Sequence, residues 1–234
     1  MKTTMTHIGN FFFQYRNRLF PLIVLVIFAL QPPRPAQVMD WLALTIALSG
    51  LAFRSFVIGY AYIKRGGLNK KVYAENLVTE GLFGVCRNPL YVGNMLIYVG
   101  VFLLHGSPLV AVVGIATFLF IYQCIIYAEE AFLRNKFGVG YDQYCREVAR
   151  WIPNFRTFGK ATEGMKFNAG RAIKKDYSTI ATTLVMLALA QIYKHAYYGD
   201  SANIATLIMA IVAIGVWAGL VRYFKKRGSH KIAV

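Results

Sequence analysis

The stretch PLYVGNMLIYVGVFLLHGSPLVAVVGIATFLFIYQCIIYAEE, residues 89–130, predicts two helices that cross a membrane and fold back on each other. A helix needs about 20 mostly apolar residues to cross the hydrocarbon layer. The apolar runs 90–105 and 108–128 meet or approach that length, and the turn between them contains Gly106 and Pro108. Ser107 precedes Pro108 as a capping residue precedes a proline at the first helical position. We therefore expect a helical hairpin within a membrane.

The composition of the whole chain extends this prediction. Of its 234 residues, 57% are hydrophobic and only ten are acidic. One soluble core of this size cannot hide so much apolar surface. Six segments qualify as spans or nearly do, although the first and third are short or interrupted: 11–31, 38–63, 90–105, 108–128, 178–197 and 201–223. We expect an all-α, polytopic helical bundle in the membrane, with about six transmembrane helices.

The net charge of +16 is distributed as in a membrane protein. Residues 64–89 contain five Lys and Arg and residues 129–177 contain ten, whereas the turns 105–108 and 198–202 contain none. The positive-inside rule therefore predicts that both termini and the long basic segments face the cytoplasm. Attraction to anionic lipid headgroups accounts for the remaining charge, so we expect the lipid bilayer as a partner and no nucleic acid.

The cysteines and histidines predict neither a disulfide nor a metal site. Cys86 and Cys145 fall on the reducing side of the membrane, and Cys124 falls within a span. No two of the four histidines share the spacing of metal ligands.

Two charged motifs lie at the cytoplasmic ends of the hairpin. Arg87-Asn88-Pro89 begins one helix, where unpaired N–H groups and a positive dipole end favour a carboxylate or phosphate. An ordinary capped helix start would look the same. Glu129-Glu130 closes the other helix, where carboxylates oppose the helix dipole. Two ribose hydroxyls or a basic partner would explain the pair, and Arg134, one turn on from Glu130, is the simplest basic partner.

Further candidates lie within the spans and in the long basic segment 129–177. Arg54 is deep in its span, so its side chain either reaches back to the headgroups or clamps an anionic part of the substrate. Gly93 and Gly100 share a helix face, which is typical of close helix packing. The aromatic residues Tyr91, Tyr141, Tyr144 and Trp151 suit a membrane boundary, and the last three share one face of a helix that Pro153 would end.

These motifs fall within one third of the chain, residues 77–157. In chain order they are Leu77-Val78-Thr79 with Gly81, Arg87-x-Pro89-x-Tyr91-x-Gly93, Glu129-Glu130, Phe137-Gly138, Tyr141, Tyr144 and Arg150-x-x-Pro153. Their order and approximate spacing resemble those of the isoprenylcysteine carboxyl methyltransferases and the related membrane phospholipid N-methyltransferases. The combination is specific, although no single motif in it is.

The resemblance implies S-adenosylmethionine as the cofactor, bound on the cytoplasmic side, and a lipid or prenylated substrate that enters from the membrane. It assigns the methionine end of the cofactor to Arg87, Asn88, Pro89, Tyr91 and Gly93, the ribose to Glu129 or Glu130, and the closure of the pocket to Tyr141, Tyr144 and Arg150. We expect the catalytic group to be Arg54, Glu130 and Arg150. Because a sulfonium is already an activated methyl donor, the protein needs mainly to align the nucleophile and exclude water.

Two features depart from the family pattern. Asn88 stands where the family usually has His, although an amide can also cap a helix and donate a hydrogen bond. The last two spans, 178–223, extend past the usual catalytic ending, and could shape a lipid entrance, form a dimer surface or anchor the chain. We expect one membrane domain, 1–234, with N-terminal spans in 1–76, the cofactor-binding core in 77–157, and an interfacial helix and hairpin in 158–234.

The sequence is compatible with three functions. The first is methyl transfer to a membrane-embedded lipid, as isoprenylcysteine carboxyl O-methylation or as phosphatidylethanolamine N-methylation. The second is reduction of a sterol-like lipid by NADPH, for which no pattern of phosphate-binding residues is present. The third is a membrane protein that keeps the pocket without catalysis.

Overall fold

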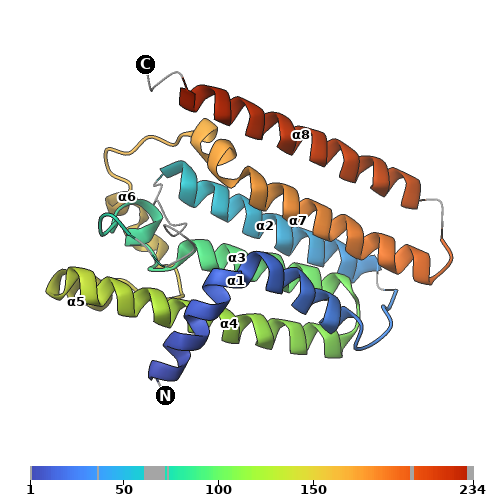
Figure 1. Ribbon diagram of the computed structural model, residues 1–234, viewed down its shortest axis with the longest axis horizontal. Helices are drawn as coiled ribbons and strands as arrows, with labels where there is room; N and C mark the ends of the chain where they lie inside the picture. Colours follow the sequence, from blue (N-terminus) through green and yellow to red (C-terminus); the bar gives the residue numbers. More distant parts are fainter. Residues whose placement is uncertain (1, 36, 61–71, 73, 201–202, 231–234) are drawn as a thin grey trace.

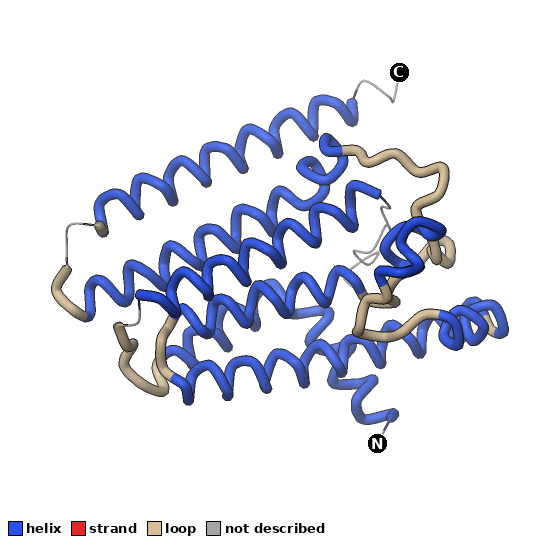
Figure 2. Tube along the Cα trace, turned by 180° about the vertical axis from the view of Figure 1, so that it is seen from behind, coloured by secondary structure: helices blue, strands red, loops and turns tan. Residues whose placement is uncertain are grey.

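The computed structural model describes residues 2–35, 37–60, 72, 74–200 and 203–230, and all regular structure within these ranges is helical. Six long helices lie side by side, with α1 crossing the others more steeply (Figures 1 and 2). They are α1 (Lys2–Phe28), α2 (Gln37–Tyr60), α3 (Pro89–Leu104), α4 (Pro108–Phe137), α7 (Ala169–Tyr197) and α8 (Ile204–His230). The prediction of an all-α bundle is confirmed.

Four of these helices, α1, α2, α4 and α8, are long and apolar enough to cross a membrane, and α3 is a shorter apolar helix. The chain is thus an integral membrane protein of the polytopic helical type. Helix α8 lies at the outer edge of the bundle against α7, and none of its residues from Ile204 to Arg227 is buried. Its exposed apolar side chains suit contact with lipid.

Helices α2 and α3 approach each other closely because glycines and alanines lie between them. A Cβ atom added at Gly100 would lie 2.4 Å from the backbone oxygen of Ala43, and one added at Gly93 would lie 2.5 Å from Cγ of Arg54. Such distances are far inside van der Waals contact. Both glycines therefore allow α3 to pack closely against α2, as the sequence predicts.

In the hairpin of α3 and α4, each helix begins at its predicted proline, Pro89 or Pro108. Asn88 and Ser107 occupy the predicted N-cap positions, but neither side chain caps its own helix. The hydroxyl of Ser107 instead donates to Gln31 Oε1 at 2.6 Å, and Asn88 Nδ2 donates to the backbone oxygen of Arg150 at 3.2 Å. Both residues therefore connect the hairpin to neighbouring segments.

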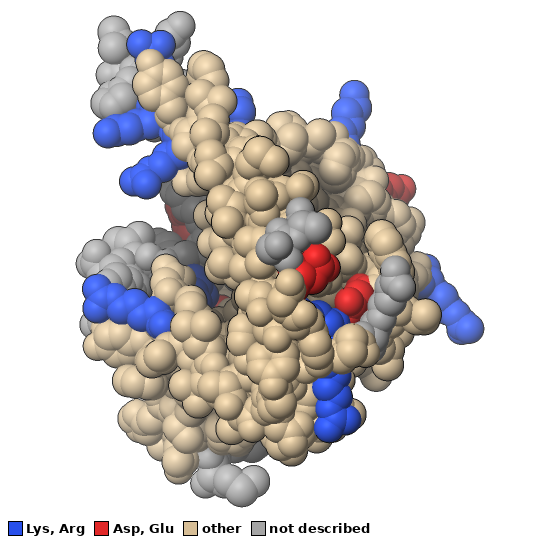
Figure 3. All heavy atoms as spheres, turned by 90° about the vertical axis from the view of Figure 1, so that its right-hand side faces the viewer, with Lys and Arg blue, Asp and Glu red and all other residues tan. Residues whose placement is uncertain are grey.

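The shorter helices gather at one end of the bundle, which we call the pocket end (left in Figure 1). They are η2 (Gly81–Gly84), α5 (Val139–Glu147), η3 (Phe155–Thr157) and α6 (Phe158–Ala161). The turns from α3 to α4 and from α7 to α8 form the other end, the turn end. Figure 3 looks onto the turn end and shows a mostly uncharged surface with few Lys, Arg, Asp and Glu side chains. The Lys and Arg residues within 64–71 lie outside the described residues.

Helix α5 is shorter than its sequence pattern predicts. The spacing predicts a helix that continues to Pro153 and contains Trp151. Helix α5 instead ends at Glu147, and the backbone of Val148 is extended. Residues 148–154 instead run beside residues 85–87: the Arg87 N–H donates to the Ala149 oxygen, and the Asn154 N–H donates to the Val85 oxygen, both at 2.9 Å. These long-range hydrogen bonds satisfy backbone groups that a continued helix would otherwise pair.

Candidate functional site

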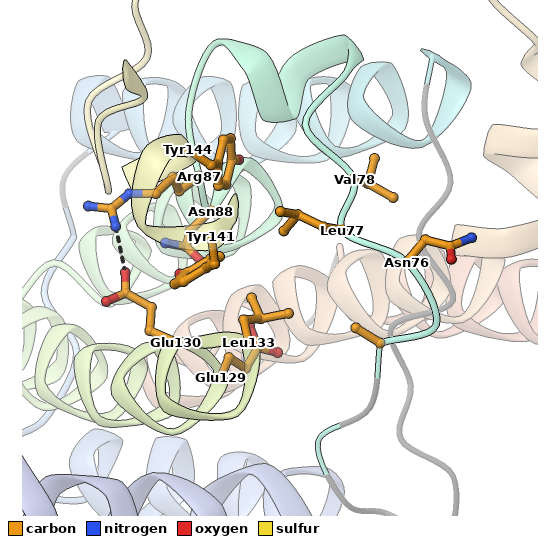
Figure 4. A pocket seen from close by; sticks show the side chains of 11 residues that line it. Asn76, Leu77, Val78, Arg87, Asn88, Glu129, Glu130, Leu133, Tyr141 and Tyr144 are labelled. Carbon is orange, nitrogen blue, oxygen red and sulfur yellow. Dashed lines mark ion pairs between the residues drawn. The ribbon is translucent and has the colours of Figure 1, made fainter. Parts of the chain in front are cut away.

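A cavity opens at the pocket end, between the first turn of α3, the last turns of α4, and α5 (Figure 4). It encloses about 400 Å³ of empty space, part of it open to solvent. Its lining residues are Ala74, Asn76, Leu77, Val78, Arg87, Asn88, Glu129, Glu130, Leu133, Tyr141 and Tyr144. The lining combines charged, aromatic and apolar side chains, as ligand sites commonly do.

Glu130 is the centre of a charged cluster on one wall of the cavity. Arg150 grips its carboxylate with two parallel hydrogen bonds, from Nε to Oε1 at 2.9 Å and from Nη2 to Oε2 at 2.8 Å. Arg87 reaches the same carboxylate at 3.3 Å through Nη1, along the dashed line in Figure 4. The cluster joins α4 to the two neighbouring segments that contain Arg87 and Arg150. Arg134, the simplest partner expected for Glu130, instead pairs with Asp142 at 2.7 Å.

Arg87 has bonding capacity beyond this ion pair. Its Nη1 also donates to Cys145 Sγ at 2.8 Å, while its buried Nε has no hydrogen-bond partner among the residues that the structure describes. A buried N–H without an acceptor is uncommon in a folded protein. This atom is therefore a donor that a bound ligand could use.

Glu129 lies beside Glu130 and is equally buried, at 4% exposure for each residue. The hydroxyl of Tyr91 donates to Glu129 Oε1 at 2.7 Å. A buried carboxylate needs hydrogen-bond donors, and a charge-assisted bond of this kind is stronger than a neutral one. Tyr91 thus orients the second carboxylate of the cavity.

Tyr141 and Tyr144 come from α5 and lie beside Arg87 and Asn88 on one side of the cavity, as Figure 4 shows. The hydroxyl of Tyr144 donates to the Phe83 backbone oxygen at 2.6 Å, which holds α5 against the segment before α3. Burial, reinforced by the nearby Glu130 carboxylate, raises the pKa of Tyr141. Its phenol therefore stays protonated at neutral pH and can donate a hydrogen bond.

The structure gathers most of the predicted site residues around this cavity. Arg87, Asn88, Glu129, Glu130, Tyr141 and Tyr144 line it, and Tyr91 and Arg150 hold its carboxylates. Pro89 begins α3 at its edge. Gly93 instead faces Arg54 and Gly50 of α2, and Arg54 is not among the lining residues.

Three lining residues were not singled out by sequence reasoning. Leu133 follows Glu129 by one helical turn. Had the helix been predicted to continue past Glu130, Leu133 would have been expected on the same face as Glu129. Ala74 and Asn76 precede the Leu77-Val78-Thr79 motif in an irregular segment. We find no sequence signal that would have placed them at the cavity.

The charged side chains of the lining are Arg87, Glu129 and Glu130, and Arg150 pairs with Glu130 from outside the lining, so these four formal charges balance. The cavity thus presents both a cation and carboxylates, which suits a ligand that carries charges of both signs.

Comparison with known proteins supports the same family. Residues 41–139 match the family model described as phospholipid methyltransferase. This match takes in α2 to α4 and begins before the core expected at 77–157. It is independent of the geometry of the cavity and covers both of its glutamates.

Three curated relatives are similar to part of the chain. The Arabidopsis thaliana protein-S-isoprenylcysteine O-methyltransferase A is 37% identical over 80 residues, which are 34% of this chain and 40% of the relative. The cobalt-zinc-cadmium resistance protein CzcN of Cupriavidus metallidurans is 32% identical over 89 residues, 38% of this chain and 41% of its own. The nickel-cobalt-cadmium resistance protein NccN of Alcaligenes xylosoxydans xylosoxydans is 32% identical over 85 residues, 36% and 39% of the two chains.

The chain thus spans about two fifths of the length of these relatives. No solved structure gives a significant match. Two of the relatives are named for metal resistance, but among the residues that the structure describes no three His, Cys, Asp or Glu side chains come together as a metal site would require.

Proposed function

We propose that this chain, whose residues 41–139 match the phospholipid methyltransferase family model, transfers a methyl group from S-adenosylmethionine to a lipid held in the membrane. The observation that carries the proposal is that partly buried Arg87 and buried Glu129 and Glu130 line one cavity at the pocket end. S-adenosylmethionine carries a carboxylate, an ammonium and a sulfonium, and the cluster presents an arginine for the first and carboxylates for the other two. The cavity also adjoins the apolar helices α3 and α4, so a lipid could reach it from the bilayer.

We assign the binding of the cofactor to the lining residues. The N–H groups of Arg87 suit its carboxylate, and Glu129 or Glu130 suits its ribose hydroxyls or its positive charges. We assign the part of the site next to Arg87 to Asn88, Pro89 and Tyr91. Tyr141 and Tyr144 then exclude water from the bound cofactor. S-adenosylmethionine supplies an activated methyl group when bound, so the protein's part is alignment and exclusion of water.

Glu130 and Arg150 are our candidates for groups that act on the substrate. The side chain of Arg150 is partly exposed, whereas that of its partner Glu130 is buried. A guanidinium in this position can bind a carboxylate substrate, and a carboxylate can accept the proton of an amine substrate. The first case corresponds to O-methylation of an isoprenylcysteine, the reaction in the name of the plant relative, and the second to N-methylation of phosphatidylethanolamine.

Isothermal titration of the purified protein tests the proposal. S-adenosylmethionine and its demethylated product should both bind, and NADPH should not. Binding of NADPH alone would favour a reductase, and binding of none of the three would favour a protein without this catalysis. Mass spectrometry of lipids from cells with and without the gene should then reveal a methylated species that depends on the gene.

We further propose that the pocket end and both termini face the cytoplasm. The positive-inside rule supports this orientation, because the turn end is poor in Lys and Arg. In right-side-out cells, a cysteine introduced as Asp200→Cys at the turn end should react with a membrane-impermeant thiol reagent. Cys145 at the pocket end should stay unlabelled until the cells are permeabilised. Labelling of Cys145 in sealed cells would reverse the topology.

A further inference from the structure

Arg54 uses all of its N–H groups within the protein. Nε and Nη2 donate to the two carboxylate oxygens of Asp176 at 3.1 and 2.6 Å, and Nη2 also contacts Thr179 Oγ1 at 3.4 Å. Nη1 donates to Asn94 Oδ1 at 2.6 Å and to the Leu90 backbone oxygen at 3.2 Å. A guanidinium has five N–H donors, and these contacts employ each of its three nitrogens. The expected clamp on an anionic substrate stays a prediction, but the contacts favour a role inside the protein.

The same contacts join three helices at one point. Arg54 belongs to α2, Asp176 and Thr179 to α7, and Leu90 and Asn94 to α3. The pair is deeply buried, with side-chain exposures of 10% for Arg54 and 3% for Asp176. A buried arginine is destabilising without its counter-ion, so Asp176 is what allows Arg54 to reach α3.

The part of α3 that Arg54 holds includes its first turn, which directly follows the lining residue Asn88. Leu90, whose carbonyl accepts from Arg54, stands between Pro89 and Tyr91. Tyr91 donates to Glu129, and Asn88 lines the cavity. A shift of this turn would therefore move the donors that orient the cavity carboxylate.

We propose that Asp176, acting through Arg54, is a positioning residue that fixes the first turn of α3 and with it the edge of the cofactor pocket. Helix α7, which lies outside the family's usual catalytic region, then takes part in the site because it supplies the counter-ion. The assignment to a cofactor pocket rests on the proposed function, whereas the control of the α3 turn by Asp176 does not.

The chain offers a matched control at the far end of the same two helices. Lys194 of α7 donates to Asp40 Oδ1 of α2 at 2.5 Å, and Lys194 is 6% exposed. Both pairs thus tie α2 to α7 through a buried cation. Asp40 precedes Arg54 by 14 positions, which at 1.5 Å per residue places the control about 21 Å along α2 from the pocket pair.

Cys86 is a native probe of the α3 turn that needs no cofactor. It is fully buried, and its thiol donates to the backbone oxygens of Arg150 and Trp151 at 3.5 and 3.3 Å. Burial raises the pKa of this thiol to about 11. Because alkylation needs an accessible thiolate, Cys86 should react slowly while the turn stays in place.

The experiment compares Asp176→Asn with Asp40→Asn in the full-length protein. The rate of N-ethylmaleimide labelling of Cys86 is followed by peptide mass spectrometry at neutral pH, and the affinity for S-adenosylmethionine by titration. Both variants should lower the melting temperature, because each leaves a buried cation without its partner. Only Asp176→Asn should speed the labelling of Cys86, by roughly tenfold or more, and weaken cofactor binding by a similar factor.

A double variant covers the case in which Asp176→Asn does not fold. In Arg54→Met with Asp176→Leu, apolar side chains replace the ion pair, a change that is often neutral for stability. The turn of α3 still loses the guanidinium, so Cys86 labelling should again rise.

The proposal is overturned if Cys86 labelling in these variants stays at the wild-type rate or rises no more than in Asp40→Asn. If the wild-type protein binds no S-adenosylmethionine, the proposed function fails, but the labelling of Cys86 still decides whether Asp176 positions the turn.

Discussion

Glu130→Gln should both destabilise the protein and weaken S-adenosylmethionine binding by at least about tenfold. Glu130 accepts two hydrogen bonds from Arg150 and lies 3.3 Å from Arg87, so the change leaves two guanidinium groups without their common counter-ion. Removing one partner of a buried ion pair costs about 3–5 kcal/mol, and the lower end applies here because Arg150 is partly exposed. Thermal unfolding and titration with S-adenosylmethionine measure the two effects separately.

The control for this variant is Asp142→Asn, which removes a neighbouring but exposed ion pair. Arg134 and Asp142 join α4 to α5, and both side chains are 49% exposed. Exposed pairs contribute about 1 kcal/mol or less, so this variant should behave almost as the wild type does. Equal effects of the two variants would mean that Glu130 has no special place in the site.

The bundle itself is predictable from the sequence because its cause is local. Apolar runs such as 108–128 predict membrane helices by their length alone, and Pro89 and Pro108 mark where helices begin. Gly93 and Gly100 likewise predict close packing, since only small residues allow two helix backbones to approach.

The ends of helices are less predictable, since contacts far apart in sequence decide them. The spacing of Tyr141, Tyr144 and Trp151 is helical, yet α5 ends before Trp151. Hydrogen bonds to residues 85–87 fix residues 148–154 in another path, and the indole of Trp151 donates to Gln123 Oε1 at 2.8 Å. No periodicity within 139–153 contains this information.

The identities of charged partners are hidden for the same reason. The spacing of Glu130 and Arg134 favours a pair one turn apart, but the bundle places Arg87 and Arg150 closer to Glu130. Asp176 was not singled out in the sequence at all, because nothing near it in the chain indicates a buried partner on α2. A buried charge such as Arg54 predicts that a partner exists, and only the fold shows which residue it is.

Glu129 and Glu130 differ in their surroundings, so their variants should differ as well. Glu130 is held by Arg150 and Arg87, whereas the hydroxyl of Tyr91 donates a hydrogen bond to Glu129. The carboxylate of Glu129 also lines the cavity, where it can attract the positive charge of a ligand.

Glu129→Gln should weaken the binding of S-adenosylmethionine by at least about tenfold, and that of its demethylated product by less, because the product lacks the sulfonium charge. Titration of both ligands gives the ratio of their dissociation constants, which should shift towards the product. Tyr91→Phe is the control: it keeps the carboxylate and removes only the hydrogen bond at 2.7 Å, so it should weaken both ligands by similar factors. An unchanged ratio in Glu129→Gln, with the protein folded, would assign Glu129 to structure alone and remove the electrostatic argument for a cationic cofactor.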